Sequence, residues 1–147
     1  MVAGSREAHI DTAPWRRALL VWMLIVLAET AHGMVRELFI APAIGDLRAR
    51  QLGVFIGSVL VIAIAWFTAR WLDARTRGVQ LMIGALWVVL TLIFEILLGR
   101  AIGASWERIA SDFNPARGGF MLAGLAVLFF APRIAARLRS VDAGRTA

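Results

Sequence analysis

Four long apolar runs, separated by short charged segments, limit what this chain of 147 residues can fold into. A helix needs about 20 apolar residues to cross a hydrocarbon core of about 30 Å. Hydrophobic residues make up 60% of the chain, whereas soluble domains contain roughly 45–50% apolar residues. The sequence therefore predicts an all-α integral membrane four-helix bundle. Its predicted spans are approximately 15–41, 51–72, 79–99 and 118–138, in a domain of residues 15–141 flanked by polar tails at 1–14 and 142–147.

The first apolar run is interrupted by charge in the stretch AETAHGMVRE, residues 28–37. Its uninterrupted part, Ala18 to Ala28, would span only about 16 Å as a helix, which is half of a membrane. Two interpretations are open: the helix ends near Gly33, or it continues to Pro42. Apolar residues continue beyond the charges, so we favour the long helix. This interpretation places the charges inside the membrane.

Arginine supplies every positive charge of the side chains at neutral pH, with 16 Arg and no Lys. We attribute this to codon bias in a GC-rich bacterial genome. Ten arginines lie on the side of the predicted bundle that holds both termini, five lie on the other side, and Arg36 is assigned to neither. Cytoplasmic loops of membrane proteins carry the excess of positive charge. The sequence therefore predicts a multi-pass protein of the bacterial inner (cytoplasmic) membrane with both termini in the cytoplasm. The lipid bilayer is thus a predicted partner, and the net charge of +6 needs no nucleic acid to explain it.

A short amphipathic helix is predicted between the third and fourth spans. Apolar side chains recur there at i, i+3, i+4 and i+7, at Trp106, Ile109, Ala110 and Phe113. This spacing is typical of a helix that lies in the membrane interface. Ser105 is a candidate N-cap, and Asn114-Pro115 is a candidate end.

Ionisable residues interrupt two of the predicted spans at similar depth. Glu29, His32 and Arg36 are spaced at i, i+3 and i+7, so they share one face of a helix. Glu95 and Ser58 lie at comparable levels on the third and second spans. Charges inside a membrane face a bundle interior or water and find partners. We expect a polar pocket open toward the outer side, lined by Glu29, His32, Arg36, Ser58 and Glu95. A structural ion pair between Arg36 and Glu95, and an early end of the first helix, are alternatives.

The stretch from Glu29 to His32 has the form E-x-x-H, which is half of the di-iron motif of ferritin-like bundles. One chain could offer Glu29, His32 and Glu95 as ligands to Mn, Fe or Zn, and a homodimer could complete a larger set. The absence of Cys excludes disulfides, thiol redox chemistry and Cys-ligated metals. No catalytic motif is recognisable, so no catalytic residue or cofactor is assigned and an enzymatic role is not favoured.

Three tryptophans lie near one level in the predicted inner half: Trp22, Trp66 and Trp87. With Phe129 and Phe130 they could close the pocket as an aromatic gate, or they could be ordinary packing residues. Gly53 and Gly57 form a GxxxG pattern, which lets membrane helices approach closely. For this pattern we favour close packing within the chain over a dimer interface.

Three functions are compatible with this pattern. The first is a membrane protein that binds or conducts a small ion or polar solute, as a homo-oligomer. The second is an accessory or assembly subunit of a larger membrane complex, in which other membrane subunits are the partners. The third is a membrane metalloprotein that uses Glu29 and His32.

Overall fold

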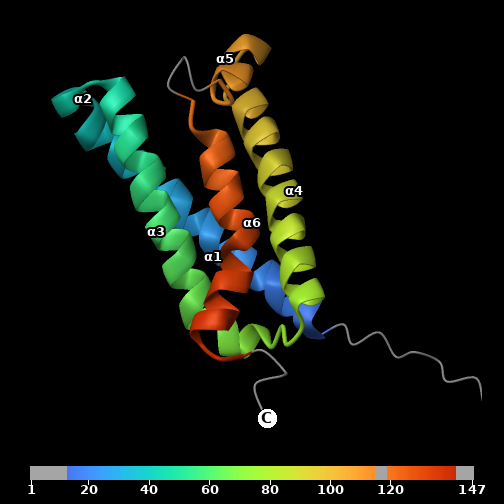
Figure 1. Cartoon of the computed structure of the whole chain (residues 1–147). Coiled ribbons are helices and arrows are strands. Elements are labelled where there is room, and N and C mark those ends of the chain that lie inside the picture. Colours follow the sequence, from blue (N-terminus) through green and yellow to red (C-terminus); the bar gives the residue numbers. More distant parts are fainter. Residues whose placement is uncertain (1–12, 115–118, 142–147) are drawn as a thin grey trace, which may run out of the picture.

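The computed structural model describes residues 13–114 and 119–141, and every regular element in this part of the chain is a helix (Figure 1). The helices are α1 (Ala13–Val35), α2 (Ala41–Ile44), α3 (Asp46–Leu72), α4 (Arg77–Ala101), α5 (Trp106–Ser111) and α6 (Met121–Leu138). Four helical stretches are long and apolar enough to cross a membrane: Pro14–Ile44, Asp46–Leu72, Arg77–Ala101 and Met121–Leu138. The prediction of an all-α protein with four helices long and apolar enough to cross a membrane is confirmed. The predicted tails lie outside the described residues except for residues 13 and 14, and so does Pro115.

The first helix continues past Gly33, as the long interpretation predicted. A π-helical turn, Arg36–Ile40, joins α1 to α2 without a break. Pro42 follows this turn and has no N–H to donate to the carbonyl four residues before it. The N–H of Ala41 bonds instead to the carbonyl of Arg36, five residues back. The widened turn therefore coincides with the charged stretch of the sequence. π turns of this kind are frequent at functional sites.

The connection between α2 and α3 is a single residue, Gly45, with a φ of 87°. This backbone conformation is in the left-handed region, which glycine adopts without a Cβ clash. α3 therefore begins at Asp46 rather than near Gln51.

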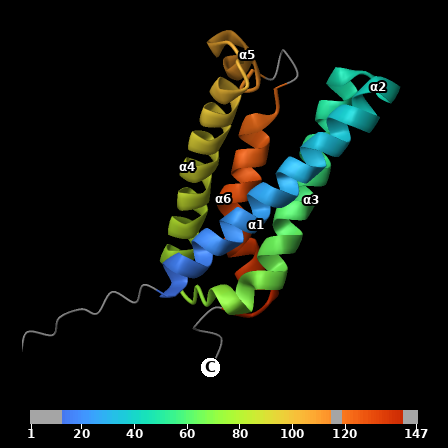
Figure 2. The ribbon, with the colours of Figure 1, turned by 180° about the vertical axis from the view of Figure 1, so that it is seen from behind.

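α6 lies between α3 and α4, and α1 crosses behind the three of them (Figure 1). Seen from behind, α1 begins beside the start of α4 and rises diagonally toward the start of α3 (Figure 2). Side-chain contacts agree with this path. Trp87 of α4 donates a hydrogen bond from Nε1 to the carbonyl of Ala18, over 2.9 Å. Just beyond the end of α1, the side chain of Arg36 lies against Gly53 of α3. The diagonal path thus moves the end of α1 away from α4.

The hydrophobic core fills only one half of the bundle. We call this half, which contains the start of α1 and the end of α6, the termini half, and the other the α5 half. Among the described residues, the buried positions of the α5 half are Ala49, Gly57 and Gly119. The core of the termini half consists of Ala18, Val21, Ile25, Val61, Ala65, Ala69, Leu72, Ala74, Ile83, Trp87, Leu128, Ala131 and Ala135. The termini half is therefore closed by packing, whereas the α5 half buries few side chains.

A polar side chain is buried within the termini half without loss of hydrogen bonds. Gln80 donates from Nε2 to the carbonyl of Ala74 over 2.8 Å. Its Oε1 accepts a hydrogen bond from Nη1 of Arg133 over 2.9 Å. A buried amide that both donates and accepts a hydrogen bond stabilises the arrangement of the groups it joins. Gln80 therefore ties the α3–α4 turn to α6 through α4.

Candidate functional site

Glu29 and His32 of α1, and Arg36 at the start of the π-helical turn that continues α1, lie against α3. Nδ1 of His32 lies 3.6 Å from Oε2 of Glu29. A Cβ added at Gly57 would lie 2.7 Å from Oε2 of Glu29, and one added at Gly53 would lie 2.8 Å from Cδ of Arg36. The two glycines therefore provide the space that these side chains occupy. The prediction that the GxxxG pattern serves close packing within the chain is confirmed.

Each of the three side chains holds one buried polar atom that has no hydrogen-bond partner among the described residues. These atoms are Oε1 of Glu29, Nε2 of His32 and Nη1 of Arg36. The side chain of His32 is only 12% exposed. A buried polar group that stays unpaired costs about 1–3 kcal/mol, and a charged group costs more. Three such atoms on one helix face indicate a site that a polar ligand or water would satisfy.

Arg36 does not pair with Glu95. Its Nη2 lies 3.4 Å from Oε2 of the neighbouring Glu37. The alternative of a structural Arg36–Glu95 ion pair is therefore wrong for this structure. The physical reason is the diagonal path of α1, which carries Arg36 toward α3 and away from α4.

Ser58 bonds within its own helix. Its Oγ donates to the carbonyl of Val54 over 2.7 Å. This bond to the preceding turn is a common way for serine to satisfy its hydroxyl inside a helix. Ser58 is next to Gly57 in the chain, but the bond that the structure records for it does not involve the cluster on α1.

Glu95 belongs to a different place in the fold. It is exposed and lines a pocket of about 170 Å³ between α4, α5 and the start of α6, together with Arg108, Asp112 and Met121. The structure therefore separates the predicted pocket into the cluster of Glu29, His32 and Arg36, which we call the α1 cluster, and a second pocket that contains Glu95.

The separation of Glu95 from His32 also bears on the metal-site prediction. In the described residues, no group of three or more His, Asp or Glu side chains lies close enough together to hold a metal ion. The predicted ligand set of Glu29, His32 and Glu95 is therefore not assembled within one chain. Glu29 and His32 face α3, whereas Glu95 projects from α4 toward α5.

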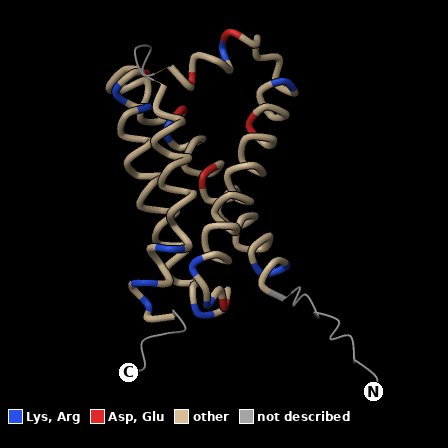
Figure 3. The backbone as a smooth tube through the Cα atoms, turned by 45° about the vertical axis from the view of Figure 1, so that its right-hand side comes forward, with Lys and Arg blue, Asp and Glu red and all other residues tan. Residues whose placement is uncertain are grey.

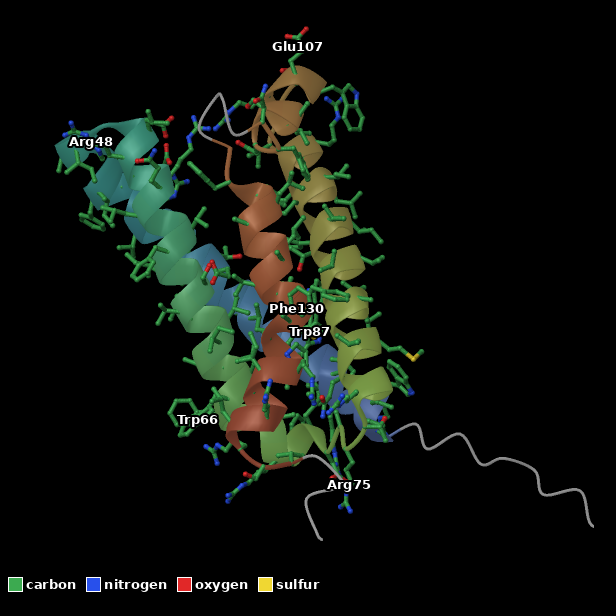
Figure 4. All side chains as sticks on the ribbon, in the orientation of Figure 1. Arg48, Trp66, Arg75, Trp87, Glu107 and Phe130 are labelled. Atoms are coloured by element: carbon green, nitrogen blue, oxygen red, sulfur yellow. The ribbon has the colours of Figure 1, made fainter. Side chains whose placement is uncertain are left out.

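The three tryptophans of the predicted aromatic gate contact different partners. Trp22 donates from Nε1 to Oγ1 of Thr91 over 3.0 Å, and Trp87 donates to the backbone of α1. Trp66 lies nearer the end of the bundle than Trp87 (Figure 4). All three tryptophans belong to the hydrophobic core or pack against it. They help to fill the termini half below the α1 cluster.

A network of ion pairs at the α5 end was not predicted from the sequence. Asp112 Oδ1 lies 3.0 Å from Nη1 of Arg108 and 3.4 Å from Nη1 of Arg50. Arg50 also pairs with Asp46 on its own helix. The i, i+4 spacing of Asp46 with Arg50 and of Arg108 with Asp112 is visible in the sequence. Only the fold shows that Arg50 reaches across from α3 to Asp112, the residue that follows α5.

Models of known protein families, curated proteins and solved structures contain no match to this chain.

Proposed function

We propose that this chain is a small multi-pass membrane protein that binds a small ion or polar solute at the α1 cluster. The observation that carries the proposal is the set of three unpaired buried atoms on Glu29, His32 and Arg36. Ionisable residues in a membrane helix mark pathways for substrates, ions or protons. Arg36 is also the first residue of a π-helical turn, which is a frequent feature of functional sites.

Access to the α1 cluster is proposed from the α5 side. The termini half is filled by the core around Trp87 and Ile83, both completely buried. The α5 half buries few side chains, so solutes meet less packing there. Passage across the whole membrane would then require a second conformation or a second copy of the chain, because a packed core does not conduct. A homo-oligomer is the form we propose for conduction.

Replacing Glu29 with glutamine is expected to abolish ligand binding while preserving the fold, because the amide keeps the shape but loses the charge. The measurement is the thermal unfolding midpoint of the purified chain in detergent. The midpoint is measured with and without each of six candidate ligands: sodium, potassium, ammonium, chloride, inorganic phosphate and glycine. These six form the ligand panel. A ligand at 100 times its Kd stabilises the folded state by about 2.7 kcal/mol. At least one member of the panel is expected to raise the midpoint of the wild-type chain but not that of Glu29→Gln.

Glu107→Gln is the matched control, because Glu107 is an exposed carboxylate on α5, away from the α1 cluster. This variant is expected to respond to the ligand as the wild type does. The proposal fails if Glu29→Gln also responds like the wild type, or if no member of the panel stabilises the wild-type chain.

We also propose that both termini are cytoplasmic and that the membrane is the bacterial inner membrane, on the strength of the arginine bias. Arg75 and Glu107 lie at opposite ends of the bundle (Figure 4), and the chain contains no cysteine. A single cysteine can therefore report on each end. In intact spheroplasts, a membrane-impermeant maleimide is expected to label Glu107→Cys, and to label Arg75→Cys only after permeabilisation. The reverse pattern would invert the proposed topology, and α5 would then not lie at the outer surface.

A subunit of a larger membrane complex is the second candidate. The observation that favours it is the extent of exposed apolar surface, since residues of α1, α3 and α4 such as Leu27, Phe67 and Leu97 are each at least 64% exposed. Lipid covers such surfaces, but partner helices cover them equally well. Purification in a mild detergent distinguishes the two candidates. Stoichiometric co-purification of unrelated chains supports the subunit, and a homogeneous homo-oligomer supports the solute-binding protein.

A further inference from the structure

The end of the bundle where α1 begins and α6 ends is dominated by arginine (Figure 3). In the described part of the chain, its only carboxylate is Asp73. A hydrogen bond of 2.7 Å from Nε of Arg75 holds the pKa of Asp73 below its usual value, so this carboxylate is charged and engaged. The arginines at this end are Arg16, Arg17, Arg70, Arg75, Arg77, Arg133, Arg137 and Arg139. This end of the molecule therefore presents a strong excess of positive charge.

One of these arginines is held in an unusual environment. The guanidinium carbon of Arg139 lies 3.8 Å from the centre of a ring of Trp66 on α3. Its Nε is buried and has no hydrogen-bond partner among the described residues. The aromatic ring covers one face of the guanidinium. The N–H groups of the guanidinium lie in its plane and point outward from its edge. Arg139 is thus stacked and partly desolvated, with at least one donor unused.

The turn that ends α6 fixes the position of Arg139. Ser140 has a φ of 52°, in the left-handed region. The N–H of Val141 bonds to the carbonyl of Ala136 over 2.9 Å, which is the six-to-one bond of a Schellman motif. Val141 and Trp66 both pack against the hydrophobic core. The stacked pair is therefore anchored on both sides by the core rather than placed on a mobile loop.

We propose that the stacked pair of Arg139 and Trp66 binds the phosphate group of an anionic phospholipid. A guanidinium donates to phosphate oxygens in a bidentate, charge-assisted geometry. Arg139 directly follows the last residue of a membrane span, which is the level at which phosphates and tryptophans meet in a bilayer. The surrounding arginines would favour an anionic headgroup over a zwitterionic one. Inorganic phosphate has the same recognition chemistry, but it lacks the acyl chains that would lie along the adjacent apolar helices. This site is independent of the α1 cluster.

The test measures retention of lipid by the full-length chain, using native mass spectrometry after reconstitution with phosphatidylglycerol or phosphatidylcholine. The wild type is expected to retain phosphatidylglycerol in preference to phosphatidylcholine. Arg139→Gln is expected to bind phosphatidylglycerol about tenfold more weakly. Arg137→Gln removes the same charge two residues earlier from an exposed position and is expected to change binding by less than about twofold.

Equal losses in Arg139→Gln and Arg137→Gln would overturn the proposal, because general charge attraction would then explain the binding. Equal retention of the two lipids by the wild type would overturn it too. Displacement of phosphatidylglycerol by millimolar inorganic phosphate would overturn the lipid assignment. Arg139→Lys keeps the charge and loses the planar fork, so it guards against a folding defect in Arg139→Gln. Binding by Arg139→Lys equal to that of the wild type would contradict the stacked geometry.

Discussion

Gly84→Ala is expected to lower the free energy of unfolding of the bundle by about 3 kcal/mol, because overpacking against backbone forces the helices apart. Gly84 is buried in α4 where it meets α6. A Cβ at this position would collide with the carbonyl oxygen and carbonyl carbon of Phe129. Backbone atoms cannot rotate away as the end of a flexible side chain can. The measurement is unfolding of the purified chain in mixed micelles of increasing denaturing-detergent content.

Gly124→Ala is the matched control for this prediction. Gly124 lies in the facing helix α6, and a Cβ added there would meet nothing within 4 Å. Alanine also has a higher helix propensity than glycine, by about 1 kcal/mol. Gly124→Ala is therefore expected to leave stability unchanged or to raise it slightly. If both variants had the same stability, the close approach of α4 and α6 at Phe129 would be refuted.

Trp87→Ala is expected to cost about 4 kcal/mol, since deleting a buried aromatic side chain leaves a cavity that its surroundings fill only in part. The Trp87 side chain is completely buried in the termini half. Within a membrane the lost stability comes from lost packing contacts and not from a hydrophobic transfer term, because lipid is as apolar as the core. The variant also loses the hydrogen bond to the carbonyl of Ala18. Thermal unfolding followed by circular dichroism measures the effect.

Two further substitutions separate the causes. Trp87→Phe retains an aromatic ring but has no N–H. Its stability is therefore expected to lie between that of the wild type and that of Trp87→Ala. Trp106 is 61% exposed on α5 and stacks on Arg100 at 5.0 Å. Trp106→Ala is therefore expected to cost less than about 1 kcal/mol. Equal unfolding midpoints for Trp87→Ala and Trp106→Ala would show that the core does not lie where the structure places it.

The predictions at Gly84 and Trp87 concern the half of the bundle that holds α1 in place. The α1 cluster lies beyond that half, where α1 has moved from α4 to α3. A weakened core would therefore change the path of α1 before it changed any residue of the cluster. Loss of ligand binding in Gly84→Ala or Trp87→Ala would therefore indicate that α1 has shifted. Loss of binding in Glu29→Gln would indicate that the carboxylate charge itself is needed.

Residue order alone is sufficient to identify the four membrane spans and the shared face of Glu29, His32 and Arg36. Both are local properties: apolar length decides whether a helix can span a bilayer, and a rise of 1.5 Å with 3.6 residues per turn decides which side chains are neighbours. The N-cap at Ser105 is local for the same reason, and its Oγ accepts a hydrogen bond from the N–H of Arg108 over 3.2 Å. The same local logic favoured continuation of the first helix beyond Gly33.

Side-chain contacts between different helices could not be predicted from the sequence, because similar depth in a membrane does not specify which helices are adjacent. Glu95 and Arg36 are predicted at similar levels, yet the path of the first helix places Arg36 beside Gly53 of α3. That path depends on which small residues allow close approach, at Gly84 between α4 and α6 and at Gly57 between α1 and α3. The positions of close approach depend on how all four helices pack together. Only the tertiary structure could therefore divide the predicted pocket in two and place Arg139 on Trp66.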